Sequence, residues 1–483
     1  WSVKNAIDYM LTADFAILNL ASERSAHFLY KAWELARANV EAGGKGEPFA
    51  YLIAPDQWDP WSAREMLRRM ALAGIAVERA SAKFQAAGEE YPEGTYVIGA
   101  GQPFRGYLMD LLEPQHYPEI RSGANGVTKR PYDIAGWTLS MSMGVQVDRV
   151  DRPFQAKLED MADLAPLASS HDHRDDSFFL TMADELAQHR APRWTNDGRL
   201  AGAPGTDASI VKWELRTPRV GVYESWIPNA DAGWTEWVLD NFKVPYAALH
   251  NDDFRSGDLR ARADTIILPS ESAASILYGI RPGERAAGRV GVETGLQRPE
   301  YTGGIEIQGL ERLDRFVRDG GTLIAFDAAA ELPARYFPLG LRLLLHSPAA
   351  QGLEAEAPAG GYYCPGSLLR ITVDTSNPIA FGMPENAFAF SSGGQAFEIS
   401  LLPEFNTGDV EIRTVARYAA SNLLASGWIS GERAVLGRPI LVEARHGKGR
   451  VVLFGFRPQF RGQTFGTLKL LLNAIYLASA RSL

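Results

Sequence analysis

The first residues that could do chemistry are a histidine and a glutamate three positions apart in "EPQHYPEIRS". His116 and Glu119 have a spacing at which two side chains can bind one zinc ion, in a chain with only 8 histidines. A hydrolytic site needs a third ligand, and His250 lies downstream in the required order. The segment "TNDGR" at 195–199 lies between them as a candidate substrate-binding segment. These residues define the hypothesis of a cryptic zinc hydrolase.

Pro118 argues against this metal site. It restricts Tyr117 to an extended conformation, and in a polyproline-like stretch residues three apart are about 9 Å apart along the axis. Zinc holds its nitrogen and oxygen ligands at about 2.0–2.2 Å, so two such side chains would have to converge strongly. His250 is followed by Asn-Asp-Asp, which is typical of a loop that enters a helix. We therefore predict no metal ion at these residues.

The densest group of potential ligands is "SSHDHRDDS", residues 169–177. If this segment were extended, His171 and His173 would project to the same side and could share a metal ion. The alternative is a solvated, charged turn that supplies the N-cap of the following helix. The sequence favours the turn.

Nucleophilic catalysis would require a thiol or hydroxyl on a tight turn between a strand and a helix, with a histidine as base. The strand in "IAFDAAA" ends at Asp327, which offers neither group. The single cysteine, Cys364, lies before a proline in "YYCPGS", and Ser270-Glu271 have no histidine nearby in the sequence. The glycines of "HGKGR" predict a hairpin turn and not a phosphate loop, since no helix follows directly. We predict a catalytically silent unit here.

The N-terminal half is expected to contain a long helix over residues 2–42 and then an α/β domain. "FAYLIAPDQ" predicts a strand, "DPWSAREMLRRMALAG" a helix with Asp59 as N-cap, and "IAVERA" and "GTYVIGA" two more strands. A weaker copy of this unit extends to residue 217, and "RPYDIAGWTLSMSMGVQVDRVD" between the copies is expected to be strand-rich. Residues 45–217 are therefore predicted to form one accessory domain with two weakly similar halves.

From Arg219 onward, strands and helices alternate at short spacing, from "RVGVYES" to "TLIAFD". Such spacing implies right-handed crossovers and a parallel sheet with helices on both faces. Residues 331–440 are predicted to be an irregular insertion, followed by a hairpin that turns at 446–449 and a closing helix. The fold class is α/β with two α/β units, and the second, residues 218–483, resembles the flavodoxin-like sheet of class I glutamine amidotransferases.

Composition limits the partners. At 483 residues the chain should hold about three units of ~150 residues, and its net charge of −9 without a basic run excludes a nucleic-acid partner. One cysteine excludes an internal disulfide framework, and no apolar window is long enough for a membrane span. The opening "WSVKNAIDYM" predicts that residues 1–44 are a linker helix that follows a missing domain.

Several long strings resemble one family. They include "YLIAPDQWDPWSAREMLRRMALAGIAVERA", "YPEGTYVIGAGQPFRGYLMDLLEPQHYPE", "RVGVYESWIPNADAGWTEWVLDNFKVPY" and "GKGRVVLFGFRPQFRGQTFGTLKLLLNAIY". They are similar to the long C-terminal region of large bacterial zinc carboxypeptidases of the carboxypeptidase A-like metallopeptidase family. The resemblance covers essentially the whole chain.

The resemblance implies that a catalytic zinc domain precedes this chain and is its partner in cis. In the family the zinc ligands, the substrate-binding arginine and the general base belong to that domain, so no catalytic or metal residue is expected here. The full-length protein would remove C-terminal residues from a peptide substrate and would be secreted or periplasmic. The first alternative is a peptide- or glycan-binding module that uses the crevice at the carboxyl ends of the sheet. The second is the zinc hydrolase with His116, Glu119 and His250.

Overall fold

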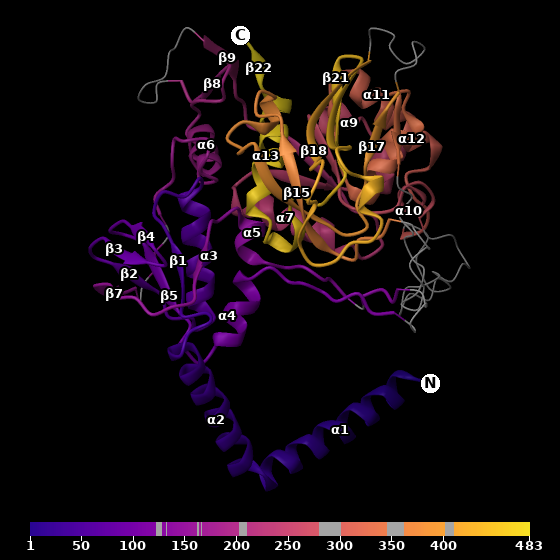
Figure 1. Ribbon diagram of the computed structural model, residues 1–483. Coiled ribbons are helices and arrows are strands. Elements are labelled where there is room, and N and C mark those ends of the chain that lie inside the picture. Colours follow the sequence, from indigo (N-terminus) through magenta and orange to yellow (C-terminus); the bar gives the residue numbers. More distant parts are fainter. Residues whose placement is uncertain are drawn as a thin grey trace. The chain divides into compact units, whose positions relative to one another are not determined.

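The computed structural model describes residues 1–121, 128–131, 133–161, 164–165, 167–201, 210–279, 301–344, 362–400 and 410–483 (Figure 1). The chain forms two compact units. The first consists of residues 1–56, 67–112 and 146–165, and the second of residues 57–66, 113–145 and 166–483. Among the helices within the described ranges, none combines the length and the apolar character that crossing a membrane requires.

The first unit is built on a five-stranded antiparallel sheet with the order β6-β1-β5-β2-β7. A separate hairpin pairs β3 with β4. The elements are α1 (Val3–Glu23), α2 (Ser25–Gly44), β1 (Ala50–Ile53), α3 (Pro60–Leu72), β2 (Glu78–Ala80), β3 (Phe84–Ala86), β4 (Glu89–Tyr91), β5 (Tyr96–Gly99), α4 (Arg105–Leu112), β6 (Asp148–Val150) and β7 (Leu158–Asp160). The strand–helix–strand–strand order predicted for residues 50–99 is confirmed. Helix α3 is divided, because residues 57–66 belong to the second unit.

The predicted N-terminal helix is two helices. They are separated at Arg24, whose φ of −115° lies outside the helical range. Helix α1 begins with a capping box, in which Ser2 and Asn5 each bond the other's backbone N–H. None of the residues of α1 is buried.

The second unit contains a ten-stranded sheet, of which five strands are parallel. The parallel strands are β10 (Val220–Tyr223), β11 (Tyr246–Leu249), β12 (Thr265–Leu268), β13 (Thr322–Phe326) and β21 (Gly449–Phe454). Their spatial order is β11-β10-β12-β13-β21. Numbered along the chain, the strands read 2-1-3-4-5, which is the flavodoxin-like order. The predicted fold class is therefore confirmed by the topology of the sheet.

The remaining strands extend this sheet in the antiparallel sense beyond β21. They are β20 (Pro439–His446), β18 (Val410–Tyr418), β15 (Ser367–Val373), β16 (Asn386–Ser391) and β19 (Leu424–Ser426). The hairpin predicted to turn at 446–449 is confirmed. The insertion predicted to be irregular supplies four of these five strands, and β14 (Leu341–Leu343) pairs with β17 (Phe397–Ile399) in a separate sheet. The strands were missed although β15 and β18 have 7 and 9 residues, because their pairing joins segments that are distant in the sequence and the loops between them hide the order of the sheet.

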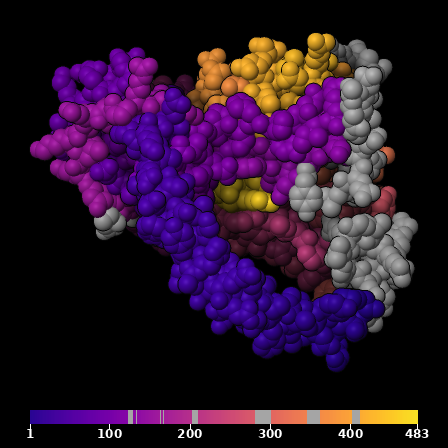
Figure 2. All heavy atoms as spheres, turned by 60° about the horizontal axis from the view of Figure 1, so that its bottom comes forward, coloured from indigo at the N-terminus to yellow at the C-terminus, as the bar shows by residue number. Residues whose placement is uncertain are grey.

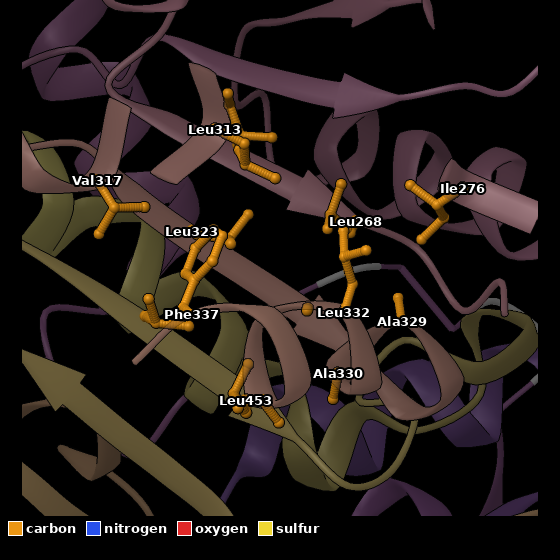
Figure 3. Packing of buried hydrophobic residues seen from close by; sticks show 14 of the residues in the cluster. Leu268, Ile276, Leu313, Val317, Leu323, Ala329, Ala330, Leu332, Phe337 and Leu453 are labelled. Carbon is orange, nitrogen blue, oxygen red and sulfur yellow. The ribbon is translucent and has the colours of Figure 1, made fainter. Parts of the chain in front are cut away.

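Helices cover both faces of the parallel strands. Helices α8 (Asn251–Ser256), α9 (Leu259–Arg262), α10 (Ala273–Tyr278), α11 (Glu306–Arg318) and α12 (Glu331–Tyr336) contribute to one core cluster, whereas α7 (Ala230–Asn241) and α13 (Phe465–Ser479) contact the sheet outside that cluster. Figure 3 shows part of this cluster, where Leu268 of β12 and Leu323 of β13 lie near Leu313 of α11. Strands buried on both faces explain the near-continuous apolar runs in the sequence.

Two expectations for residues 45–217 are not met. The segment expected to be strand-rich contains a helix, α5 (Leu139–Met143), and one short strand, β6. The second half of the supposed repeat has its helix, α6 (Phe178–Ala187), and late strands β8 (Arg193–Thr195) and β9 (Val211–Glu214), but residues 169–177 form no strand. Strand β9 pairs with β8 on one side and with β22 (Arg481–Ser482) on the other, and the pairing with β22 is a long-range one that local patterns do not encode.

A buried ion triad joins three segments of the second unit. The Lys469 Nζ of α13 lies 2.7 Å from Asp59 Oδ2 and 2.6 Å from Asp176 Oδ1, and all three side chains are at most 6% exposed. Asp59 also caps α3 by accepting from the Ser62 backbone N–H at 2.9 Å, as predicted. One lysine thus holds two helix starts that are far apart in the sequence.

Removing the cation of this triad should destabilise the protein strongly. In Lys469→Met, Asp59 and Asp176 would be buried without a counterion, so we expect the free energy of unfolding to fall by about 3–5 kcal/mol. Urea denaturation measures this loss. The exposed Lys448 provides the matched control, since Lys448→Met should change the value by less than about 0.5 kcal/mol. A loss below about 1 kcal/mol in Lys469→Met would contradict the expectation.

The triad should also make stability depend on pH. Burial raises the pKa of Asp176 to about 7, with Lys469 opposing and Asp59 adding to the increase. The folded chain therefore keeps a proton that the unfolded chain releases near pH 4, so this contribution to stability falls from pH 4 to pH 7. Because asparagine does not titrate, the stability of Asp176→Asn relative to the parent should rise over that range and level off above it. Urea denaturation at each pH tests this, and a constant difference would refute it.

Candidate functional site

The carboxyl edge of the parallel sheet is the candidate site, because open α/β sheets bind ligands there, at the point where the strand order reverses. That point lies between β10 and β12. Ser225 follows β10 and Glu271 follows β12, and the Ser225 hydroxyl donates to Glu271 Oε1 at 3.0 Å. Ser275 Oγ donates to the same oxygen at 2.5 Å. Glu271 is 6% exposed, so a carboxylate is held inside the switch point by serine hydroxyls.

Asp327 occupies the turn between β13 and a short 3-10 helix, residues 327–330. Its φ of +46° is a strained conformation for a non-glycine residue. The same tight strand-to-helix geometry holds the nucleophile in enzymes that use such an elbow. Here the buried carboxylate of Asp327 accepts from Arg457 Nε at 3.1 Å and from Ser270 Oγ at 3.2 Å. The elbow therefore exists, but an ion pair occupies its side chain.

Arg457 links this elbow to a second carboxylate. Its Nη1 lies 3.2 Å from Asp231 Oδ2 in the first turn of α7. Burial raises the pKa of both Asp327 and Asp231, while Arg457 lowers both. The guanidinium of Arg457 thus favours the charged form of both buried carboxyl groups.

Aromatic rings surround the carboxyl ends of β10 and β11. Trp226 stacks on His250 with a centroid distance of 4.1 Å and an interplanar angle of 14°, and Tyr301 lies 4.7 Å from the indole. Trp226 is nevertheless 39% exposed. His250 is the N-cap residue of α8, and its Nδ1 lies 3.0 Å from the carbonyl oxygen of Glu224. Trp226, His250 and Tyr301 form one aromatic group, in which Trp226 is exposed and the other two rings are partly buried.

Glu224, two residues before Trp226 in the sequence, shares a hydrogen bond with the carboxyl group of Glu236. Glu224 follows β10, and Glu236 lies on α7. The Glu224 carboxylate, which accepts a hydrogen bond from protonated Glu236, raises the pKa of Glu236 to about 7, and burial adds to the increase. The pair therefore shares a proton near neutral pH, and it could accept from or donate to a polar ligand. Sequence reasoning missed it because the two glutamates come from different elements.

The residues of the zinc hypothesis lie in separate surroundings. His116 forms an isolated bridge with Gly427. Glu119 accepts from Arg121 and from Thr128 Oγ1, contacts that lower its pKa. His250 belongs to the aromatic group at the sheet edge. Among the residues that the structure describes, no three His, Cys, Asp or Glu side chains gather closely enough to hold a metal ion.

The two histidines of residues 169–177 have different environments. His171 is exposed, whereas His173 is buried with Nδ1 2.5 Å from Gly198 O and Nε2 2.7 Å from Asn473 Oδ1. Its ring stacks on Phe178 at 4.2 Å. Burial outweighs these two acceptor oxygens and lowers the pKa of His173 to about 4. His173 is part of the core packing, and both of its nitrogens are occupied.

Cys364 is 1% exposed, and its thiol donates to the Ser391 carbonyl at 3.0 Å. Burial raises the pKa of the thiol to about 11, so the reactive thiolate is scarce at neutral pH. Cys364 precedes β15, in the antiparallel extension, and does not occupy the elbow after β13. Cys364 is therefore a buried thiol outside the carboxyl edge.

No family model matches the sequence, and none of the curated proteins is similar to it. Solved structures match at low sequence identity. A ThuA-like protein from Bacteroides uniformis has 15% identity and a TM-score of 0.31, covering 58% of this chain and 95% of its own. A GMP synthase component from Thermoplasma acidophilum has 12% identity and a TM-score of 0.32, covering 54% and 94%. A beta-galactosidase from Bacillus circulans has 12% identity and a TM-score of 0.28, covering 54% and 32%.

Proposed function

We propose that this chain is the non-catalytic accessory region of a secreted or periplasmic zinc carboxypeptidase, and that α1 and α2 pack against its catalytic domain. The observation that carries the proposal is the exposed apolar surface of α1. Its large apolar side chains are all more than 40% exposed: Val3, Ile7, Tyr9, Met10, Leu11, Phe15, Ile17, Leu18 and Leu20. None of the residues of α1 is buried, and Figure 2 shows the indigo N-terminal part of the chain at the surface.

These side chains extend around most of the helix, since successive residues are about 100° apart. A wide apolar stripe on a helix is normally buried against another element, and large exposed apolar patches mark interaction sites. Helix α2 adds Phe28, Leu29 and Trp33, each about half exposed or more. A catalytic domain in cis would bury this surface without an intermolecular cost of association.

The Asp327–Arg457 pair supports the non-catalytic part of the proposal. The elbow after β13 presents a carboxylate that is already bound by a guanidinium, and the only thiol of the chain is buried elsewhere. In the complete protein, zinc would be held by the catalytic domain and would activate water for cleavage of the C-terminal peptide bond. The residues described here would contribute surface and shape to that domain.

Expression of the chain together with its natural upstream sequence tests the proposal. We expect the longer protein to bind one zinc ion per chain and to release the C-terminal residue of a peptide with a free carboxylate, but not of the amidated peptide. Binding of the separately expressed upstream domain to this chain should weaken at least tenfold in Ile7→Ser/Leu11→Ser/Leu18→Ser. The matched control is Asn5→Ser/Thr12→Ser/Asn19→Ser on the same helix. An upstream sequence without a His-x-x-Glu zinc domain would end the proposal.

A second candidate function is favoured by the aromatic group at the sheet edge. An exposed indole beside a proton-sharing carboxyl pair offers both an apolar face and hydrogen-bonding groups, which is the combination that small-molecule sites use. A sugar ring would place its apolar C–H face on such a ring and its hydroxyls on the carboxyl groups. The candidate is a glycan-binding module at the carboxyl edge.

Ligand-induced melting shifts test this candidate. We expect one class of oligosaccharide, among cellotetraose, chitotetraose and maltotetraose, to raise the melting temperature, and a tetrapeptide not to raise it. Trp226→Ala should abolish the shift, and the loss of its stacking on His250 should also lower the unliganded melting temperature. Tyr336→Ala is the control, because that ring is equally exposed on α12. A shift that persists in Trp226→Ala would exclude this site.

A further inference from the structure

The antiparallel extension of the second unit contains a polar hollow of about 380 Å³. This volume is within the range of small-molecule sites, roughly 300–1,000 Å³. The hollow lies at the end of the sheet opposite the carboxyl edge, because Arg450 lies at the start of β21. Its charged lining comes from three adjacent strands and one turn: Glu411, Arg413, Glu443, Arg445, Lys448 and Arg450.

The strand register explains why these charges converge. Arg445 of β20 pairs with Glu411 on β18 and with Arg450 on β21, so the three side chains form one row across the sheet. Arg413 pairs with Glu443 two residues further along, on the same face. The alternate residues, such as Ala444 and Val451, belong to the apolar core on the other face. The hollow is therefore a built feature of the sheet and does not depend on flexible loops.

The charges in the hollow do not balance. Arg413 donates to Glu411 Oε1 at 2.7 and 2.9 Å, and Arg450 lies 3.0 Å from Glu443 Oε1. These two ion pairs use both acidic groups. Arg445 and Lys448 have no ion pair within the described parts of the chain, and both are exposed. Two uncompensated positive charges remain, in a protein whose net charge is −9.

Two further features bring the positive charges close together. Arg445 lies directly opposite Arg450, and like charges in that position are destabilising. The turn at Gly447, whose φ of +60° suits glycine, brings Lys448 to the rim of the same hollow. An anion between these groups would relieve the repulsion, and guanidinium groups recognise oxyanions with two parallel hydrogen bonds.

We propose that this hollow is a binding site for a phosphate group, either as inorganic phosphate or on a small phosphorylated molecule. Arg445 and Lys448 supply the two charges that match a dianion, and Arg450 supplies a third donor group. The site is independent of the accessory role proposed above and of the aromatic group at the carboxyl edge. It gives the antiparallel extension a ligand-binding role of its own.

Binding of inorganic phosphate to the whole chain tests this proposal. Isothermal titration calorimetry at constant ionic strength should detect one site, and the melting temperature should rise in phosphate relative to chloride. Glucose 1-phosphate should compete for the same site if the group is recognised on a carrier, and the absence of competition would restrict the site to the free ion. In Arg445→Gln/Lys448→Gln, phosphate affinity should fall at least tenfold.

The double variant should fold normally, because both side chains are exposed and the change removes a repulsion. Its melting temperature without phosphate should therefore equal or exceed that of the parent. Arg433→Gln/Arg438→Gln removes the same charge from exposed positions outside the hollow and should bind phosphate like the parent. The proposal is overturned if the parent does not bind phosphate, if Arg445→Gln/Lys448→Gln binds as tightly as the parent, or if the control loses affinity equally.

Discussion

The contact between Lys469 and the carboxylates of Asp59 and Asp176 is the constraint on which the second unit depends. It joins residues 57–66, which are followed by a segment of the first unit, to the closing helix α13 and to the start of α6. A buried ion triad adds little net stability compared with apolar packing, but breaking it is costly. The triad therefore favours one arrangement of the three segments over others. Arrangements that separate these three segments would leave a charge buried without a partner.

The same sheet presents two chemically different edges. At the carboxyl edge, strand ends place carboxylates, serines and the exposed Trp226 around the point where the strand order reverses, which is where α/β sheets bind ligands. At the opposite end, the antiparallel strands carry alternating arginines and glutamates on a largely exposed face. In the parallel part of the sheet, all the segments that follow the strands leave at the carboxyl edge, so their polar residues gather there.

The elbow after β13 has a backbone geometry that holds a nucleophile in other proteins, but the side chain at this position is a carboxylate. Asp327 has the positive φ of a nucleophile turn, but Arg457 and Ser270 bind its carboxylate. Helix α1 has large apolar side chains, but none of its residues is buried within the described chain. Both features fit a region that acts by packing and binding alongside another domain, as proposed above.

Local patterns determined much of this structure in advance. Helix α3 with its Asp59 cap, the parallel strands from β10 to β13 and the hairpin before Gly449 follow from periodicity and turn residues, which depend on neighbouring positions. Only the tertiary structure decided that Lys469 pairs with Asp59, that the supposed insertion extends the sheet, and that Arg445 faces Arg450. The ion pair depends on side chains brought together from distant segments, and the facing arginines depend on strand register, where a one-residue shift would move Arg445 to the other face.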